Sequence, residues 1–450
     1  LGRELDYALL SYASHLAYGR LDPREIRPDW QSTRRPRDLA LVLDAALASN
    51  RLESALEELA PAQPGYKALS AALVRYREID ARGGWPLMPV LSPGRHISGT
   101  ERELLARRLD AEGDLDATNW RVTGTDADLA DALRRFQRRN GLRDHGALDE
   151  GTLRALNVTA AERVKQMVWN LERWRWLPDS FGTRYLLVNI PAFRLQAIED
   201  GHVRLEMRAV VGKAAEPTPV LSDEMTSVVF SPFWNVPERI AREEVLPALR
   251  EDPDYLESQN LQLLRTSTNN GRRELDPGSG RMEGWAFRQR PGMGNVMGDV
   301  KFALPNRFDV YLHDTPDSAS FYAERPMFSH GCVRVERPAA LAQYVLRSQS
   351  YWTPMRIHAA MNAGRERAVP LPVPLPVHIV YWTAWVDEDG AVNFRDDAYG
   401  YDAAQARALL AEATVAAPRT KPREATPVAP ALVRSSRRQP PRSEVALSPL

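Results

Sequence analysis

The period of the apolar residues changes near Arg184, and this change divides the 450-residue chain into two structurally different parts. Before it, apolar residues recur every three or four positions, as they do on one face of a helix. After it, short β-rich runs alternate apolar and polar residues. These runs are 185–190, 194–199, 203–211 and 225–230. We therefore predict a multidomain α+β fold, in which helical regions precede a mainly β domain.

The first 96 residues predict a helical scaffold lobe. Its apolar stripes are expected to pack in a core; they comprise Leu5, Leu9, Tyr12 and Leu16, then Leu39, Leu43 and Leu47, then Leu52, Leu56 and Leu59. Residues 159–180 form an amphipathic segment rich in tryptophan, which we expect to pack back on this lobe. No chemistry is expected of the lobe itself.

Residues 97–158 predict a separate small module of three helices. Thr125 or Asp126 caps its middle helix, Gly141 follows that helix, and Asp149 caps the next one. One helix face is basic, with Arg134, Arg135, Arg138 and Arg139. Such a face is usually solvated, and binding of a specific ligand is the alternative.

Residues 181–402 predict the β-rich domain. Within it, 238–290 interrupt the strand pattern and are expected to be an insertion, either a lid or a surface excursion without a role. A helix is expected at 338–347, and a final hairpin at 377–386 and 391–394. Residues 415–450 are rich in Pro, Arg, Ser and Ala, which predicts a disordered tail.

The overall charge excludes some partners. Lys plus Arg and Asp plus Glu each number 59, so bulk charge favours neither nucleic acid nor an anionic membrane surface. No run of eighteen apolar residues occurs, so no membrane span is expected in this chain. The chain begins at Leu1 without a secretory start, so a processed form, with any anchor in a segment outside it, is expected.

Cys332 is the single cysteine, in the segment Ser329-His330-Gly331-Cys332-Val333-Arg334. It can form no internal disulfide and no multi-cysteine zinc site, which leaves a buried structural thiol or a nucleophile. A nucleophilic thiol needs a neighbour that takes its proton, and His313 and His330 are candidates. The amides of Gly331 and Cys332 could donate to the oxyanion that forms on attack.

Metal binding is not expected, because the other histidines are scattered without ligand spacing. They are His15, His96, His145, His202, His358 and His378. Thioester chemistry requires neither a metal nor an organic cofactor, so we expect none.

The segment around Cys332 resembles the YkuD-type catalytic domain of the L,D-transpeptidases, and several other segments resemble the large Gram-negative, YcbB-like branch of that family. These segments occur in family order: Ser231-Pro232-Phe233-Trp234-Asn235-Val236-Pro237, Pro291-Gly292-Met293-Gly294-Asn295-Val296-Met297-Gly298, Lys301-Phe302, Leu304-Pro305-Asn306 and Tyr311-Leu312-His313-Asp314-Thr315-Pro316. The segment 132–142 resembles a peptidoglycan-binding module. The similarity covers about residues 1–402.

The resemblance implies a peptidoglycan transpeptidase that makes 3→3 cross-links between diaminopimelate-containing stem peptides through a cysteine thioester. In this reading Cys332 is the nucleophile and His313 the general base and acid, oriented by a backbone carbonyl rather than by the Asp314 carboxylate. His330 supports the oxyanion or the substrate. Arg334 binds a carboxylate or forms a structural pair, for example with Glu336.

Further residues are expected to contact the substrate, although local packing is an equal alternative for several of them. They are Tyr311, Ser329, Trp234, Asn235 and Asn295. The resemblance implies a periplasmic enzyme that acts on stem peptides and glycan and is inhibited by carbapenem β-lactams. Protein partners are not indicated.

Other activities remain open. The same site could act as an L,D-carboxypeptidase, exchange D-amino acids or attach a protein to the wall, because the acceptor is not encoded in the motif. A non-catalytic wall-binding scaffold is less compatible with an intact Cys332 and His313. A thiol protease is disfavoured because the local sequence of papain-like enzymes is missing.

Overall fold

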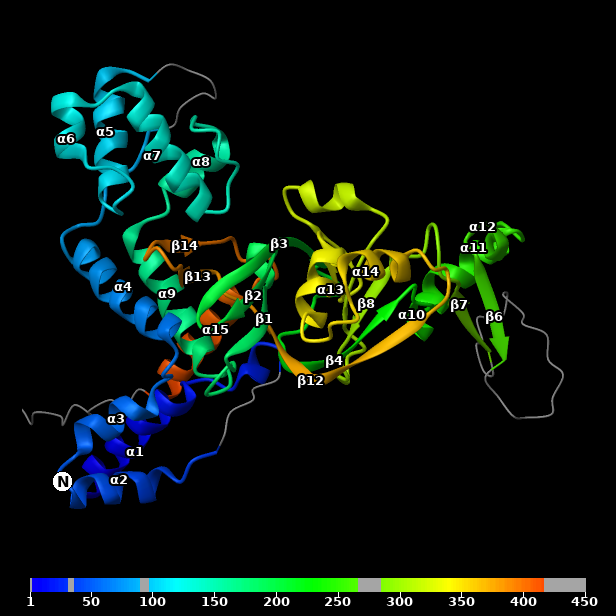
Figure 1. Ribbon diagram of the computed structural model, residues 1–450. Helices are drawn as coiled ribbons and strands as arrows, with labels where there is room; N and C mark the ends of the chain where they lie inside the picture. The colour runs from blue at the N-terminus through cyan, green and yellow to red at the C-terminus, as the bar shows by residue number, and fades with distance from the viewer. Residues whose placement is uncertain (1, 31–35, 90–96, 266–284, 417–450) are drawn as a thin grey trace, which may run out of the picture. The chain divides into compact units, whose positions relative to one another are not determined.

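The computed structural model describes residues 2–30, 36–89, 97–265 and 285–416. The predicted tail 415–450 therefore falls almost entirely outside the described residues. The predicted fold class is confirmed: helices occupy the N-terminal part, and a large sheet dominates the residues after 183 (Figure 1).

The N-terminal lobe contains α1 (Gly2–Tyr18), α2 (Leu39–Ala48), α3 (Leu52–Leu59) and α4 (Pro64–Ala81). The first three helices share a small core around Ala13, Leu43 and Leu59. The predicted stripes are only partly buried, since Leu5 is 70% exposed and Tyr12 is 54% exposed. Ala13 takes the central position instead, because a small side chain lets the helices approach closely.

The predicted module has four short helices rather than three: α5 (Gly99–Asp110), α6 (Ala117–Thr123), α7 (Asp126–Arg139) and α8 (Glu150–Leu156). Its core includes Leu105, Leu133 and Phe136. Thr125 caps α7 in a capping box, and Asp149 caps α8. The extra helix α6 begins at its own cap, Asp116, which binds two backbone amides.

A cluster of buried charges, which we call the module cluster, consists of Arg108, Arg139, Glu112 and Asp114. Glu112 Oε2 lies 2.6 Å from Arg108 Nη1 and 2.8 Å from Arg139 Nη2. Burial opposes ionisation of Glu112, but Arg139 and Arg108 outweigh it and hold the pKa of this carboxyl far below its usual range. Glu112 also accepts a hydrogen bond from Tyr76 of α4, so the cluster ties the module to the helix before it.

Helix α9 (Ala160–Trp174) packs against α4 and the small hairpin β13 (Ala384–Val386) and β14 (Val392–Phe394). Trp174 stacks on Trp382 at 4.2 Å between ring centroids. The aromatic segment thus joins the helical lobe to the last strands of the β domain by buried ring contacts.

Nine strands form the main sheet, in the order β10-β3-β11-β9-β8-β4-β12-β1-β2. An additional pairing of β3 with β2 closes the sheet on itself. The strands are β1 (Arg184–Asn189), β2 (Arg194–Glu199), β3 (His202–Gly212), β4 (Leu221–Phe230), β8 (Val300–Ala303), β9 (Leu312–His313), β10 (Met327–Ser329), β11 (Val333–Val335) and β12 (Arg367–Val380). The largest apolar core lies between this sheet and the helices α13 (Pro338–Leu346) and α14 (Pro354–Met361).

The C-terminal strands differ from the predicted hairpin. Residues 377–380 belong to the long strand β12, which pairs in parallel with β1 and antiparallel with β4, and only β13 and β14 form the hairpin. The helices α14 and α15 (Tyr401–Ala416) were not predicted.

The inserted segment forms a small lobe with its own core. Its three-stranded sheet has the order β5-β7-β6, with β5 (Trp234–Asn235), β6 (Leu261–Arg265) and β7 (Trp285–Gln289). Its helical part comprises α10 (Glu238–Ile240), a π-helical turn (Ala241–Val245), α11 (Leu246–Glu251) and α12 (Tyr255–Ser258). Val236, Leu246 and Phe287 lie in its core. We call this part, residues 234–265 and 285–289, the inserted lobe.

Candidate active site

Cys332 lies on the turn between β10 and β11, beside the strand β9 that carries His313. Strands β11 and β9 are parallel neighbours, with Arg334 opposite His313. The thiol of Cys332 is directed at the carbonyl of Asp309, with 3.7 Å between Sγ and the oxygen. The sheet register therefore brings together the residues that the sequence places nineteen positions apart.

The turn before Cys332 depends on Gly331. Its φ of +110° lies in a region that residues with a Cβ avoid. The Gly331 amide donates to Ser329 Oγ at 3.2 Å, and the Ser329 hydroxyl donates to the Cys332 carbonyl. Ser329 is buried. Ser329 thus holds the turn rather than facing a substrate, and the Gly331 amide is engaged within the turn rather than free for an oxyanion.

Tyr311 is the side chain most closely associated with the thiol. Its hydroxyl and its backbone amide both hydrogen-bond Cys332, and both interactions lower the thiol pKa. The ring of Tyr311 also lies at 5.9 Å, centroid to centroid, from the His313 ring. Tyr311 therefore stands between the two predicted catalytic groups.

His313 is buried, and its Nδ1 lies 2.5 Å from the backbone carbonyl of Asp314. This carbonyl is the kind of orienting group that the family resemblance implied. The Asp314 carboxylate instead accepts from the amides of Asp299 and Thr315. With Nδ1 donating its proton to a carbonyl, Nε2 is the nitrogen left to accept a proton.

The resting site favours a neutral thiol and a neutral imidazole. Burial, followed by the charge of Arg334, lowers the pKa of His313 to about 3. Burial raises the pKa of Cys332, although hydrogen bonds from Tyr311 and the charge of Lys301 act in the opposite direction. Among the described residues, no direct hydrogen bond joins Cys332 to His313. The thiol proton therefore stays on Cys332 in this arrangement.

Asn306 shapes the loop that faces the thiol. Its amide group donates to the Val310 carbonyl at 2.6 Å, and its oxygen accepts from the amide of Phe308. Between these residues Asp309 has a φ of +53° and points its carbonyl at the thiol. Asn306 lies in one of the segments that carry the resemblance, but its local sequence predicts no role for it.

His330 has polar partners on two segments other than the Cys332 turn. Its Nε2 lies 2.7 Å from Glu244 in the π-helical turn of the inserted lobe, and 3.4 Å from Glu216 in the β3–β4 loop. Lys213 lies 3.2 Å from the same nitrogen. In this structure His330 links the Cys332 turn to the inserted lobe, because all its close polar partners lie on these two segments.

Arg334 is a largely buried cation whose positive charge has no close carboxylate partner among the described residues. The nearest carboxylate is that of Asp317, at 3.9 Å, and Nε is buried without a partner among the described residues. The suggested pair with Glu336 is not formed, because Glu336 binds the backbone amide and the guanidinium of Arg208. The arrangement therefore favours the first of the two predictions for Arg334, which is binding of a carboxylate, over a structural ion pair.

Three further predicted contact residues have structural surroundings. Asn295 is buried at 1% exposure, and its amide bridges the carbonyls of Pro232 and Arg290. Trp234 and Asn235 lie on β5 of the inserted lobe, and Trp234 packs against the core of that lobe. Asn295 therefore fastens the loop before β8, and a substrate contact is not available to it in this arrangement.

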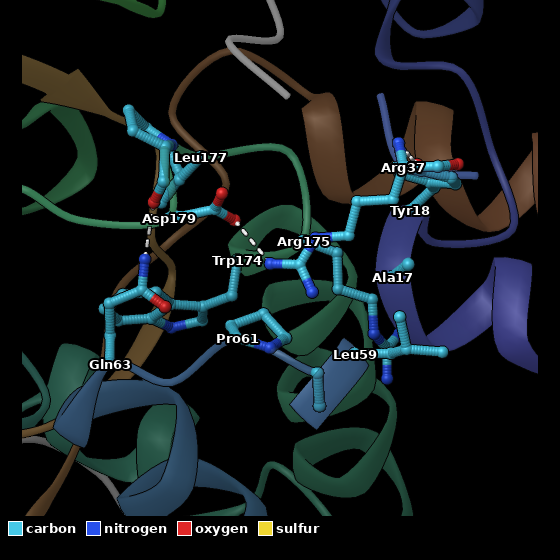
Figure 2. A pocket seen from close by; sticks show the side chains of 12 residues that line it. Ala17, Tyr18, Arg37, Leu59, Pro61, Gln63, Trp174, Arg175, Leu177 and Asp179 are labelled. Atoms are coloured by element: carbon cyan, nitrogen blue, oxygen red, sulfur yellow. Dashed lines mark hydrogen bonds and ion pairs between the residues drawn. The ribbon is translucent and has the colours of Figure 1, made fainter. Parts of the chain in front are cut away.

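A small cavity of about 20 Å³ lies far along the chain from Cys332, between α1, α3 and the end of α9 (Figure 2). Gln63 donates to the Pro178 carbonyl at its wall, and Arg37 lies 3.5 Å from Asp179. Neither cysteine nor histidine lines it. Its volume suits about one water molecule, so it contributes nothing to acyl transfer.

No cluster of three or more histidine, cysteine or acidic side chains among the described residues could hold a metal ion. No helix in the described ranges is long and apolar enough to cross a membrane.

Comparison with known proteins gives the class of the β domain. A family model described as the L,D-transpeptidase catalytic domain (YkuD) matches residues 183–370, and a model described as a scaffold domain matches residues 3–73. A curated relative from Haemophilus influenzae, named as a candidate L,D-transpeptidase, is 34% identical over 244 residues, which are 53% of this chain and 48% of the relative. The chain thus spans about half the length of that relative.

Solved structures of L,D-transpeptidases are also similar over 44% of this chain. One from Mycobacterium smegmatis has 16% identity, a TM-score of 0.23 and 58% coverage of its own chain. The catalytic domain from Enterococcus faecium has 15% identity, a TM-score of 0.20 and 96% coverage.

The match over residues 183–370 covers all nine strands of the closed main sheet except residues 371–380 of β12. Residues 183–370 are thus similar to the L,D-transpeptidase catalytic domain of the YkuD family. This confirms the resemblance that the segments around Cys332 and His313 indicated.

Proposed function

We propose that this protein is a peptidoglycan L,D-transpeptidase that forms 3→3 cross-links between diaminopimelate-containing stem peptides through a thioester on Cys332. One observation carries the proposal. The single cysteine, Cys332, follows a glycine in the turn between β10 and β11, and its thiol is hydrogen-bonded to Tyr311. The ring of the buried His313 lies next to that tyrosine.

The first step is acylation. The thiol loses its proton to Nε2 of His313 while Sγ attacks the carbonyl carbon of the donor peptide bond. Collapse of the tetrahedral intermediate breaks the C–N bond, and His313 returns the proton to the leaving amine. The Cys332 amide is the backbone donor left for the oxyanion, because Ser329 holds the Gly331 amide.

The second step resolves the thioester. The side-chain amine of a second stem attacks the thioester carbonyl, the C–N bond forms and the C–S bond breaks. His313 takes the amine proton and passes it to the departing sulfur. A neutral His313 is ready to accept a proton in both half-reactions, since its pKa near 3 keeps it unprotonated at neutral pH.

Arg334 gives the site a preference for anionic substrates. Its half-satisfied guanidinium beside His313 suits a carboxylate of the stem peptide, which can accept two parallel hydrogen bonds from it. Such substrates occur in the bacterial cell wall, so we propose that the protein works in the periplasm. We also propose that carbapenem β-lactams acylate Cys332.

The test is incubation with purified tetrapeptide muropeptides, followed by liquid chromatography and mass spectrometry. The wild-type protein should produce 3→3 dimers with release of the terminal D-residue, and Cys332→Ala should produce none. Tripeptide monomers alone would indicate an L,D-carboxypeptidase, and exchanged D-amino acids would indicate the exchange reaction. Unchanged muropeptides with the wild-type protein would contradict the proposal.

A further inference from the structure

Lys301 is a cation beside the proposed nucleophile that no motif assigns to the chemistry. It lies on β8, directly opposite His313 on β9 in the antiparallel register. Its ammonium nitrogen is 3.8 Å from the centre of the Tyr311 ring. This distance is that of a close cation–π contact.

The ammonium group lacks the partner that a partly buried lysine normally has. No carboxylate lies within ion-pair distance of it in the part of the chain that the structure describes. Asp309 and Glu366 are the acidic side chains near enough to act on it through space. Glu366 is engaged elsewhere, since it accepts a hydrogen bond from the Phe233 amide.

The neighbour that would complete the charge balance is Cys332. Tyr311 contacts both groups, because its ring faces Lys301 and its hydroxyl hydrogen-bonds the sulfur. A thiolate on Cys332 and the ammonium of Lys301 favour each other, and Arg334 acts on the sulfur in the same sense. A positive charge above the ring also makes the tyrosine hydroxyl a better donor to a thiolate.

We propose that Lys301 is a positioning residue that stabilises the thiolate of Cys332, both through space and through the ring and hydroxyl of Tyr311. The inference rests on the proposed function, because it takes Cys332 to be the nucleophile. It resolves a difficulty of the site. His313 becomes positively charged when it takes the thiol proton, and the nearby charges of Arg334 and Lys301 disfavour that state. The negative charge that forms on the sulfur of Cys332 at the same time compensates for this repulsion.

The experiment is the pH dependence of Cys332 alkylation by iodoacetamide, measured by intact mass on the full chain. The variants are Lys301→Met, which keeps length and removes charge, and Lys301→Arg, which keeps charge. Lys301→Met should shift the alkylation midpoint to higher pH and slow the reaction at pH 7 about five- to tenfold, since a tenfold change equals about one pKa unit. The rate above the midpoint should match that of the wild type.

Two controls separate the causes. Lys301→Arg should alkylate at a rate within about twofold of the wild type, because it keeps the positive charge; a twofold change is about a third of a pKa unit. Lys165 is exposed, so Lys165→Met should leave the alkylation midpoint unchanged. Tyr311→Phe keeps the ring and removes the hydroxyl. If the hydroxyl relays the effect, the double variant with Lys301→Met should be less slowed than the product of the single effects.

An unchanged alkylation profile in Lys301→Met, with a normally reactive wild type, would overturn the inference and leave the proposed function standing. Loss of cross-linking with an unchanged profile would also overturn it, since Lys301 would then act on substrate or packing. A wild-type thiol that resists alkylation at every pH, together with absence of cross-linked product, would remove the proposed function and the inference with it.

Discussion

Two groups of buried or half-buried cations in this protein differ in their partners. In the module cluster, Arg108 and Arg139 each lie within hydrogen-bond distance of a buried carboxylate. Around Cys332, Lys301 has no ion pair among the described residues, and Arg334 has one distant carboxylate. We call Lys301, Arg334, His313 and Cys332 the site cluster. Each cation of the module cluster has a carboxylate partner, whereas we infer that the charges of the site cluster are balanced only when negative charge arrives.

The difference in partners distinguishes charged side chains that stabilise the fold from those that act on a substrate or a reacting group. A compensated buried pair contributes to a fixed arrangement, and its loss leaves a stranded charge. An uncompensated cation costs stability and persists where a reaction or a ligand supplies the opposite charge. Five predictions test this division, in order of decreasing effect.

The largest effect is expected on stability when the module cluster is broken. Glu112→Gln removes the shared partner of Arg108 and Arg139, and should cost about 3–5 kcal/mol because Arg108 loses its carboxylate partner and Arg139 keeps only Asp114. Denaturant unfolding measures it. The matched control is Glu103→Gln, whose partners Arg107 and Arg121 are exposed, and it should cost less than about 1 kcal/mol. Equal, small losses would show that the module cluster is not a balanced unit.

The second prediction concerns Arg334. Arg334→Gln should lower kcat/KM for tetrapeptide donors about 10- to 100-fold, because a charge-assisted hydrogen bond contributes about 1.5–3 kcal/mol. Thermal stability should remain within about 0.5 kcal/mol, since no strong partner is lost. If the variant instead unfolds as easily as Glu112→Gln, Arg334 is a structural charge and the contrast fails.

The third prediction is a shift in the titration of His313. Its folded pKa is lowered, so the unfolded chain binds more protons between pH 3 and 6.5, and this residue costs stability as the pH falls through that window. Arg334→Gln should raise the pKa of His313 by about one unit, because one nearby charge is removed. Histidine NMR measures this. His378, whose pKa burial lowers to about 4, is the internal reference and should not move.

The fourth prediction separates the strain of the Cys332 turn from its chemistry. Gly331→Ala should cost about 1–2 kcal/mol of stability, because alanine is strained at a φ of +110°. Gly390→Ala, at φ +81° in the turn of the β13–β14 hairpin, should cost a similar amount. Only the Gly331 variant should slow acylation of Cys332. A matching slowdown in both variants would indicate a general loss of folding instead.

The smallest effect on stability is expected at the exposed part of the basic face. Arg134 and Arg138 are 43% and 60% exposed, whereas Arg139 is buried in the module cluster. Arg134→Gln with Arg138→Gln should change stability by less than about 0.5 kcal/mol. If this face binds the wall, sedimentation with intact sacculi should weaken while turnover of soluble stems is retained. Unchanged sedimentation would leave the face without a binding role.

Much of the fold followed from local patterns, and the exceptions have physical causes. Strand β12 was predicted only in part because Pro370, Pro372, Pro374 and Pro376 interrupt its sequence. These prolines are tolerated because β1 pairs only with 377–380, so the preceding residues are bonded on one side alone. Helix α14 had a readable start in Thr353-Pro354, where Thr353 accepts from the Arg356 amide.

The candidate site was predictable where the signal is local. Cys332, His313 and Gly331 stand in short motifs, and alternation along a strand places Tyr311 on the face of His313. Lys301 depends on the register between β8 and β9, which a single sequence does not encode. The family resemblance predicts oxyanion or substrate support for His330, and its partners Glu244 and Glu216 come from distant segments that the local motif does not reveal.

The central claim is that Cys332 is the nucleophile of an L,D-transpeptidase site. Intact-protein mass spectrometry after incubation with a carbapenem, with the wild type beside Cys332→Ala, tests it most directly. The wild type should carry a single drug adduct and the variant none. Adducts on both proteins, or on neither, would contradict it.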